Sequence, residues 1–245
     1  MRFKLTISYD GTNYAGWQVQ PGLPTVQQTI EDAIAVTSGV QVKIHGSGRT
    51  DRGVHAKGQV AHFDLDTRMT AKSMMFALNS RIPPDIRINS VEIVPSDFHA
   101  RRSAKAKEYR YVIWNGPVLP PQERLYAVQV HRPLDMELMR DGAARFVGEH
   151  DFVAFMANPQ RTLETTVRTI YEFEITKRGR KITFRVKGSG FLYKQVRSMV
   201  GMLVRVGTGA EKAEKITEWL DSSAPRTAHV PSAQPQGLTL WKVWY

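Results

Sequence analysis

Residues 46–60 read GSGRTDRGVHAKGQV, and in this stretch four glycines and two arginines surround a single carboxylate, Asp51. The residues on either side, 40–44 and 60–65, follow the two-residue alternation of a half-buried strand. Glycine adopts backbone angles that other residues resist, so it suits a loop that a bulky ligand approaches closely. We therefore predict two strands joined by a glycine-rich loop, with Asp51 at its centre.

Three interpretations of this loop compete. Gly48 and Gly53 have the spacing of a phosphate-binding P-loop, but Val54 stands where that motif requires lysine, so we reject this interpretation. In the second, the loop is a solvated turn in which Asp51 pairs with a neighbouring arginine. In the third, Asp51 is a catalytic carboxylate, because the guanidinium groups of Arg49 and Arg52 favour the charged form that nucleophilic or general-base chemistry requires. The loop alone leaves the last two open.

The composition is that of a globular protein with a polyanionic partner. Hydrophobic residues make up 42% of the 245 residues and charged residues 23%, which are ordinary values for a soluble protein. The chain carries 34 Lys and Arg against 23 Asp and Glu, a net charge of +11. Nucleic acid fits such an excess better than a membrane surface does.

The sequence also limits the chemistry and the location. No apolar stretch approaches the ~20 residues of a membrane-spanning helix. The first residues lack a signal-peptide pattern, so we expect no membrane association and a cytoplasmic location. The absence of cysteine excludes disulfides, thiolate chemistry and cysteine-based zinc sites. The seven histidines show no metal-ligand spacing, so we predict no metal site.

The first half of the chain predicts elements in the order β-α-β-β-α-β. Thr25 with Gln28 three residues later is a capping-box pattern, and the apolar residues that follow recur at helical spacing up to Ser38 and Gly39. The predicted elements are a strand at 3–9, a helix after Thr25, strands at 40–44 and 60–65, a helix at 71–81 that ends before two prolines, and a strand at 86–94.

The second half repeats this order with different sequence. Its predicted elements are a strand at 104–114, a helix after Asp135, a hairpin of strands 167–175 and 182–186, a long helix over 192–206, a short helix at 212–220 and a strand at 238–245. On the long helix Arg197 lies off the apolar face, where an arginine is usually solvated or in a surface ion pair.

These patterns predict an α+β fold with two domains, residues 1–103 carrying the glycine-rich loop and residues 104–245. The matching order of elements indicates two similar β-α-β-β-α-β units. We expect the units to share a mixed, largely antiparallel sheet with helices on one side and a central basic cleft.

A basic segment at 99–111 supports nucleic-acid binding, since five of its thirteen residues are Lys or Arg. Strand alternation would place Lys105, Lys107, Tyr109 and Tyr111 on one face, with charges for phosphates and rings for bases, as on a single-stranded RNA platform. Alternatively, the tyrosines pack into a core with their hydroxyls hydrogen-bonded, while the lysine stems extend to solvent. The spacing does not decide between the two.

Several segments together resemble the TruA family of tRNA pseudouridine synthases, in the right order and nearly from end to end. They are residues 9–18, the loop at 48–56, residues 98–101 with 109–111, and residues 191–201. Arg52 is a departure, because a small residue is common after the Asp in this family. An added charge there would alter how Asp51 titrates or how RNA docks.

The resemblance implies an isomerase that converts uridine to pseudouridine at positions 38 to 40 of the tRNA anticodon stem and loop, without a cofactor. It implies that Asp51 is the nucleophile and that Arg197 pairs with it and favours its charged form. It further implies that Tyr109 stacks on the target base. Arg49 is the best candidate to hold the extruded nucleotide, since a uridine in a stem must leave the helix to react. The family also implies a homodimer in which one tRNA bridges both protomers.

Two alternatives come from other functional classes. A non-catalytic RNA-binding protein would use a similar sheet as a stacking surface, but it gains nothing from a carboxylate in a basic loop that binds phosphate. A metal-dependent nuclease would use Asp51, Asp64 and Asp66 with histidines, and its activity would disappear in excess chelator.

Overall fold

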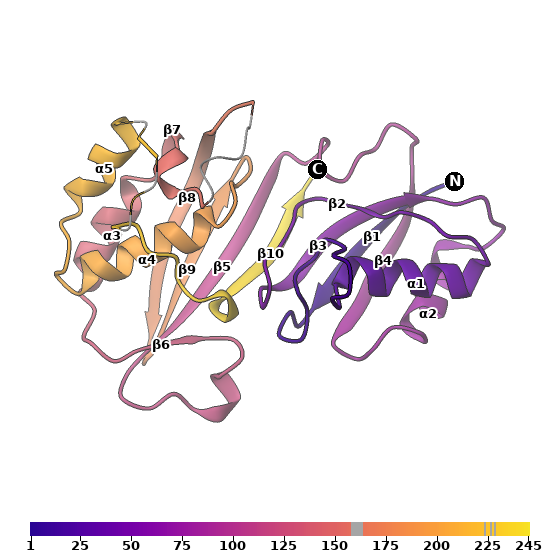
Figure 1. The fold of residues 1–245 in the computed structure, drawn as a ribbon, viewed down its shortest axis with the longest axis horizontal. Coiled ribbons are helices and arrows are strands. Elements are labelled where there is room, and N and C mark those ends of the chain that lie inside the picture. Colours follow the sequence, from indigo (N-terminus) through magenta and orange to yellow (C-terminus); the bar gives the residue numbers. More distant parts are fainter. Residues whose placement is uncertain (158–163, 223, 226, 228) are drawn as a thin grey trace. The chain divides into compact units, whose positions relative to one another are not determined.

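The computed structural model of the protein describes residues 1–157, 164–222, 224–225, 227 and 229–245. By its internal contacts the chain divides into two compact units (Figure 1). Unit 1 comprises Met1–Lys105 and Thr239–Tyr245, and unit 2 comprises Ala106–Leu238. The division predicted between residues 103 and 104 lies beside this boundary, but the last residues of the chain, which the sequence assigns to the second domain, pack in unit 1.

The sheet of unit 1 is mixed and largely antiparallel. Its central strand β1 (Arg2–Tyr9) pairs antiparallel with β3 (His55–Asp64) and with β4 (Ile86–Val94). The short β2 (His45–Gly46) is antiparallel to β3, and β10 (Leu238–Trp244) runs parallel to β3 on its other side. The order β-α-β-β-α-β is observed in the first half, although its third element is the two-residue β2 and not the predicted strand at 40–44, and residues near the C-terminus add β10.

One face of this sheet forms the core of unit 1. Alternate side chains of β1 are fully buried, among them Phe3, Leu5 and Ile7, and those between them stay partly exposed. Helices α1 (Val26–Ser38) and α2 (Ala71–Asn79) contact each other, and α2 packs on β4 (Figure 1). Both helices therefore cover the apolar face, and the other face of the sheet is polar.

The end signals of α1 act as the sequence predicts. Thr25 is the N-cap, and its hydroxyl accepts a hydrogen bond from the backbone N–H of Gln28. Gly39 ends the helix in the left-handed conformation, at a φ of +74°, and its N–H donates to the carbonyl of Ala35. The side-chain amide of Gln28 donates to Asp32 at 2.7 Å rather than reaching back to the cap, so only half of the capping box forms.

The strand predicted at 40–44 is wrong. Residues 40–44 form no regular element, and the strand that follows them, β2, covers only two residues. Since β3 already begins at His55, the loop comprises residues 47–54 rather than 46–60. The physical reason lies on α1. The carboxylate of Glu31 accepts the backbone N–H of the buried Ile44 at 2.8 Å, so a side chain takes the place of a neighbouring strand.

The strands of unit 2 are also largely antiparallel. Strands β5 (Ala106–Asn115), β9 (Lys181–Gly188), β8 (Val167–Arg178) and β7 (Gly148–Asp151) follow one another in antiparallel order, and β6 (Val128–Val130) runs parallel to β5. The predicted β8–β9 hairpin is confirmed, with a tighter turn than expected: Arg178 pairs with Lys181, and Gly179 has a φ of +59°.

The helices of unit 2 are α3 (Met136–Ala144), α4 (Gln195–Gly207) and α5 (Glu214–Asp221). In the described part of the chain, three short 3-10 helices lie at Pro121–Glu123, Val153–Phe155 and Pro235–Gly237. The predicted apolar face of α4 is too narrow, because nearly all of this helix is buried. A Cβ on Gly201 would collide with the carbonyl of Pro231, so the backbone near residue 231 covers the side that the sequence leaves to solvent.

The predicted fold class is therefore confirmed as α+β with mixed, largely antiparallel strands. Among the described residues, no helix has both the length and the apolar character that are needed to cross a membrane.

Candidate active-site loop

The glycine-rich loop at 47–54 is fixed at its start by Gln59, a fully buried residue of β3. The side-chain oxygen of Gln59 accepts the hydroxyl of Ser47 at 2.7 Å, and its amide nitrogen donates to the carbonyl of Gly48 at 2.9 Å. The N–H of Ser47 also donates to the carbonyl of Val60. The prediction from sequence missed Gln59, because nothing in its spacing separates it from an ordinary strand residue.

Thr50, the residue before Asp51, is anchored in the interior of unit 1. Its hydroxyl shares a hydrogen bond of 2.8 Å with the phenol of Tyr9, and its carbonyl accepts the N–H of Trp17 at 3.1 Å. Burial raises the pKa of Tyr9, so the phenol stays neutral at physiological pH. The residue that leads into Asp51 is thus anchored through both its side chain and its main chain.

The loop closes in a turn directly after this anchor. The carbonyl of Asp51 accepts the N–H of Val54 at 3.1 Å, and Gly53 has a φ of +74°, which favours glycine. A second glycine lets the neighbouring chain approach. Gly16 has a φ of +108°, and a Cβ there would lie 2.6 Å from the carbonyl oxygen of Thr50. The turn and the close approach together fix the backbone of Asp51.

The side chains of the loop point in different directions. Thr50 is buried, whereas Asp51 is partly exposed and Arg49 and Arg52 are exposed. Arg49 donates its Nε–H to the side-chain oxygen of Gln18 at 3.0 Å. The loop therefore presents a carboxylate and a guanidinium at the surface of unit 1, from a backbone that is held by buried contacts.

Tyr109 lies on the apolar face of β5 in unit 2. It is 8% exposed, and its ring meets that of Phe191 edge to face, with 5.2 Å between the centroids. Tyr111, on the same face, is 1% exposed and donates its hydroxyl to the carbonyl of Gln234. Tyr111 therefore packs in the core and is not part of an open platform for RNA bases.

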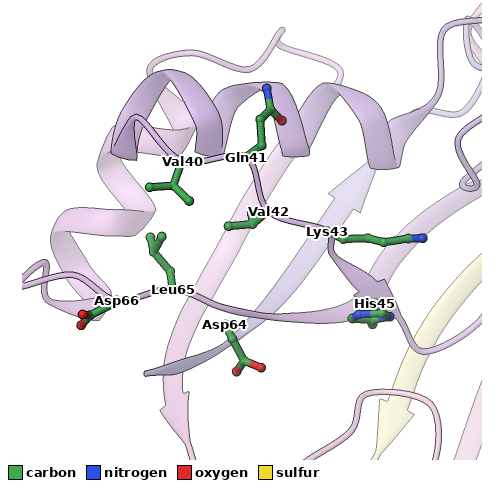
Figure 2. A pocket seen from close by; sticks show the side chains of 8 residues that line it. All are labelled: Val40, Gln41, Val42, Lys43, His45, Asp64, Leu65 and Asp66. Atoms are coloured by element: carbon green, nitrogen blue, oxygen red, sulfur yellow. The ribbon is translucent and has the colours of Figure 1, made fainter.

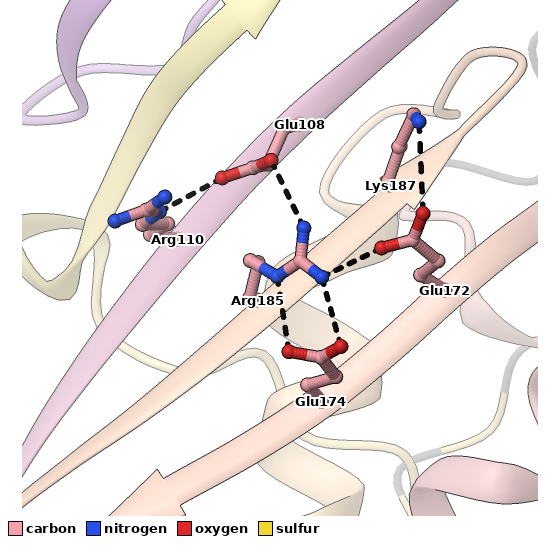
Figure 3. Close-up of polar contacts among 6 residues, drawn as sticks. All are labelled: Glu108, Arg110, Glu172, Glu174, Arg185 and Lys187. Carbon is pink, nitrogen blue, oxygen red and sulfur yellow. Dashed lines mark hydrogen bonds and ion pairs between the residues drawn. The ribbon is translucent and has the colours of Figure 1, made fainter.

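The opposite face of β5 carries a network of ion pairs (Figure 3). Arg185 binds both carboxylate oxygens of Glu174, at 3.2 and 2.8 Å, and also contacts Glu172 at 2.6 Å and Glu108 at 3.4 Å. Hydrogen bonding to Glu174, more than any other cause, raises the pKa of Arg185. Arg110 pairs with Glu108, and Lys187 pairs with Glu172. Since three cations match three carboxylates, this network carries no excess positive charge.

Arg197 is buried, contrary to what its place on the helix predicts. Only 9% of it is exposed, and its Nε–H donates to the carbonyl of Ala233 at 2.7 Å. The N–H of Ala233 donates back to the carbonyl of Arg197 at 2.9 Å. This reciprocal pair orders the guanidinium, and an arginine withdrawn from water in this way is more consistent with a functional or structural partner than with a solvated surface.

The comparison with known proteins decides the family. Residues 5–101 and 143–245 match the family described as tRNA pseudouridine synthase. The chain belongs to the tRNA pseudouridine synthase family. It is therefore an enzyme, an isomerase of tRNA modification, and the resemblance drawn from its segments is confirmed.

Individual synthases resemble this chain over their whole length. tRNA pseudouridine synthase A 2 of Clostridium perfringens is 46% identical, over 99% of this chain and 98% of the relative. tRNA pseudouridine synthase A of an Exiguobacterium species is 46% identical, over 100% of this chain and 98% of the relative. tRNA pseudouridine synthase A of a Geobacter species is 43% identical, over 99% of this chain and 98% of the relative. A chain of a solved Cbf5-Nop10-Gar1 complex matches 82% of this chain and 54% of its own length at 15% identity, with a TM-score of 0.32, which is too distant to carry an argument.

Three histidines of the synthase gather on the polar face of unit 1. The rings of His45 and His99 lie 5.1 and 4.7 Å from that of His62. Nδ1 of His62 accepts the N–H of Ala100 at 3.2 Å, which requires the neutral form. Burial, and then the positive charges of its neighbours, lower the pKa of His62 to about 4. The ring of His62 is thus packed and hydrogen-bonded as an uncharged group.

The nuclease alternative finds no support in this arrangement. Asp64 is held by Arg2 through two bonds, of 2.8 and 2.6 Å. Within the described ranges, no group of three or more His, Asp or Glu side chains could hold a metal ion. Figure 2 shows a pocket beside Asp64 and Asp66 that is lined by residues 40–43, 45 and 64–66 and by none from the loop. Asp64 and Asp66 therefore line a pocket to which Asp51 does not contribute.

Proposed function

We propose that this synthase converts uridine to pseudouridine in tRNA with Asp51 as the nucleophile. The observation that carries the proposal is the combination of a partly exposed carboxylate with a doubly anchored neighbour, Thr50. A nucleophile must meet the reacting atom in one geometry, and a backbone fixed by buried contacts provides it before the substrate arrives. Membership of the synthase family makes this carboxylate the first candidate.

The reaction needs a carboxylate and no cofactor. The bond from uracil N1 to the ribose carbon breaks, the base turns, and a bond forms from C5 to the same carbon. The proton on C5 is lost and N1 gains one, so no atoms or electrons are gained overall. An ionised Asp51 can open the glycosidic bond by nucleophilic attack and is regenerated at the end.

Other residues support this role. We propose that Arg197 pairs with Asp51 and keeps it ionised, and that its bond to Ala233 limits the orientations of its guanidinium. Tyr109 contacts the target base, with its ring edge on Phe191 setting its plane. Arg49 binds the extruded nucleotide from the exposed side of the loop.

The substrate is the anticodon arm of tRNA, at positions 38 to 40, and the enzyme acts as a homodimer in the cytoplasm. The net charge of +11 supports a polyanionic substrate. No cofactor and no metal ion take part. The target positions and the dimer follow from the resemblance to the TruA family.

The test is the position of pseudouridine in unmodified tRNA transcripts. One transcript carries uridines at 38, 39 and 40, and a matched transcript carries cytidines there and keeps every other uridine. The assay contains chelator and no nucleotide. We expect pseudouridine only in the first transcript. Modification of both transcripts at other uridines would contradict the proposed target, and binding of both without any modification would favour the non-catalytic RNA-binding alternative.

A further inference from the structure

The hydrogen bond between Gln18 and Arg49 links the catalytic loop to the segment that precedes α1. The side-chain oxygen of Gln18 accepts Nε–H of Arg49 at 3.0 Å. Among the residues that the structure describes, this is the sole hydrogen bond of the Arg49 side chain. Arg49 is exposed and Gln18 is partly exposed, so neither side chain is confined by burial.

The backbone on both sides of Gln18 is nevertheless fixed. Trp17, which is almost fully buried, donates its N–H to the carbonyl of Thr50 and accepts the N–H of Gln27 at 3.0 Å. The N–H of Val19 donates to the side-chain oxygen of Gln27 at 3.2 Å. Gln18 therefore stands on a short segment pinned to the loop on one side and to α1 on the other.

The support continues into the core. Gln27 is 2% exposed, and its amide nitrogen donates to the carboxylate of Glu31 at 2.8 Å. Glu31 also accepts the N–H of Ile44. A hydrogen bond between two long surface side chains is usually weak, because both must be immobilised to form it. The backbone of the acceptor, Gln18, is already immobilised, so forming this hydrogen bond costs less conformational entropy.

This geometry determines which edge of Arg49 is available. A guanidinium is planar and donates along fixed directions. With Nε–H bound to Gln18, the edge formed by Nη1 and Nη2 is left for a ligand, and that edge suits the two oxygens of a phosphate. Arg49 precedes Asp51 by two residues, so a phosphate bound there would belong to RNA next to the reacting nucleotide.

We propose that Gln18 is a positioning residue, which holds Arg49 with its Nη1–Nη2 edge toward an RNA phosphate beside the target uridine. This inference rests on the proposed function. Gln18 itself touches neither the uridine nor Asp51; it acts through Arg49 alone.

The test is a double-mutant cycle of Gln18→Ala and Arg49→Ala, read as the single-turnover rate at saturating tRNA transcript. We expect Gln18→Ala to lower the rate about 3- to 10-fold, as the loss of a hydrogen bond to a charged group would. In the Arg49→Ala background, Gln18→Ala should change nothing further. Gln18→Glu keeps an acceptor for Nε–H, so it should retain most of the rate. Gln20→Ala is the matched control, since Gln20 bonds Ala15 and not the loop.

The proposal would be overturned if Gln18→Ala lowered the single-turnover rate equally in both backgrounds, or did not lower it in the wild-type background. A second readout does not depend on turnover: the Nε–H resonance of Arg49 in the free protein should be protected from exchange, and Gln18→Ala should remove the protection. Unchanged protection would also overturn it. An inactive wild type would instead contradict the proposed function, and the same cycle read as RNA affinity would still test Gln18.

Discussion

The phenol of Tyr9 and the hydroxyl of Thr50 meet in the interior of unit 1 at 2.8 Å, one residue before Asp51. Tyr9 is the last residue of β1, and Thr50 belongs to the loop that the sequence marks by its glycines. A side chain of the central strand thus sets the position of the loop, and the stability of the core and the geometry of Asp51 depend on the same contact.

Tyr9→Phe should lower the free energy of unfolding by about 1 kcal/mol, because it removes one buried hydrogen bond and leaves the Thr50 hydroxyl without that partner. It should also slow pseudouridine formation. Chemical denaturation and a turnover assay measure the two effects. Thr50→Ser, which keeps the hydroxyl, is the control and should lose less. A Tyr9→Phe protein with unchanged stability would show that the bond contributes nothing.

Gly16→Ala should destabilise the protein by about 3 kcal/mol, since its Cβ meets the Thr50 carbonyl and its φ of +108° disfavours alanine. Gly22→Ala is a matched control: Gly22 has a φ of +72°, but its Cβ would meet nothing within 4 Å. Strain alone should cost about 1 kcal/mol there. Equal losses of stability in the two variants would mean that the close approach of the loop at Gly16 does not matter.

Stability should fall as the pH drops from about 6.5 toward 4, in part through His62. Its pKa is lowered to about 4 in the folded protein, against about 6.5 for an unfolded chain. Unfolding then takes up a proton, so the contribution is complete above pH 6.5 and is lost toward pH 4. His62→Gln, which keeps a neutral acceptor for Ala100, should show a shallower slope of unfolding free energy against pH in this range. An identical slope would contradict the assignment.

Arg185→Ala should destabilise unit 2 by about 2 kcal/mol, because it leaves the buried Glu108 without one of its charge-assisted bonds. RNA affinity should stay within error, since the network has no excess charge. Lys215→Ala, in an exposed pair with Glu218, should leave stability unchanged. A marked loss of RNA affinity in the Arg185 variant would mean that this face contacts the substrate.

Local signals in the sequence predict the local structure well. Thr25 and Gly39 delimit α1, and the alternation at 86–94 gives β4 with its observed bounds, because caps and strand periodicity depend on neighbouring residues. Asp51 and Arg49 could likewise be placed on a loop, since the glycines and charges that mark it are contiguous.

The contacts that escape prediction join residues that are distant in sequence. Glu31 replaces a strand partner for Ile44, Gln59 fixes the start of the loop, and the backbone near Ala233 buries Arg197. The spacing of each residue within its own element is ordinary, and only the tertiary fold supplies the partner. The anchoring of the loop is therefore a property of the folded chain, whereas the residue types that the loop carries can be read from the sequence.

The most direct test of the account is the rate of pseudouridine formation by Asp51→Asn under single-turnover conditions, with tRNA binding measured in parallel. Asn keeps the shape of Asp and removes the charge, so we expect the rate to fall by ~10³-fold or more while the affinity for tRNA stays within a few-fold. Asp66→Asn, the same change at an exposed position of unit 1, should retain the wild-type rate in the presence of chelator. An Asp51→Asn protein that turns over at a rate close to wild type would contradict the assignment of Asp51 as the nucleophile.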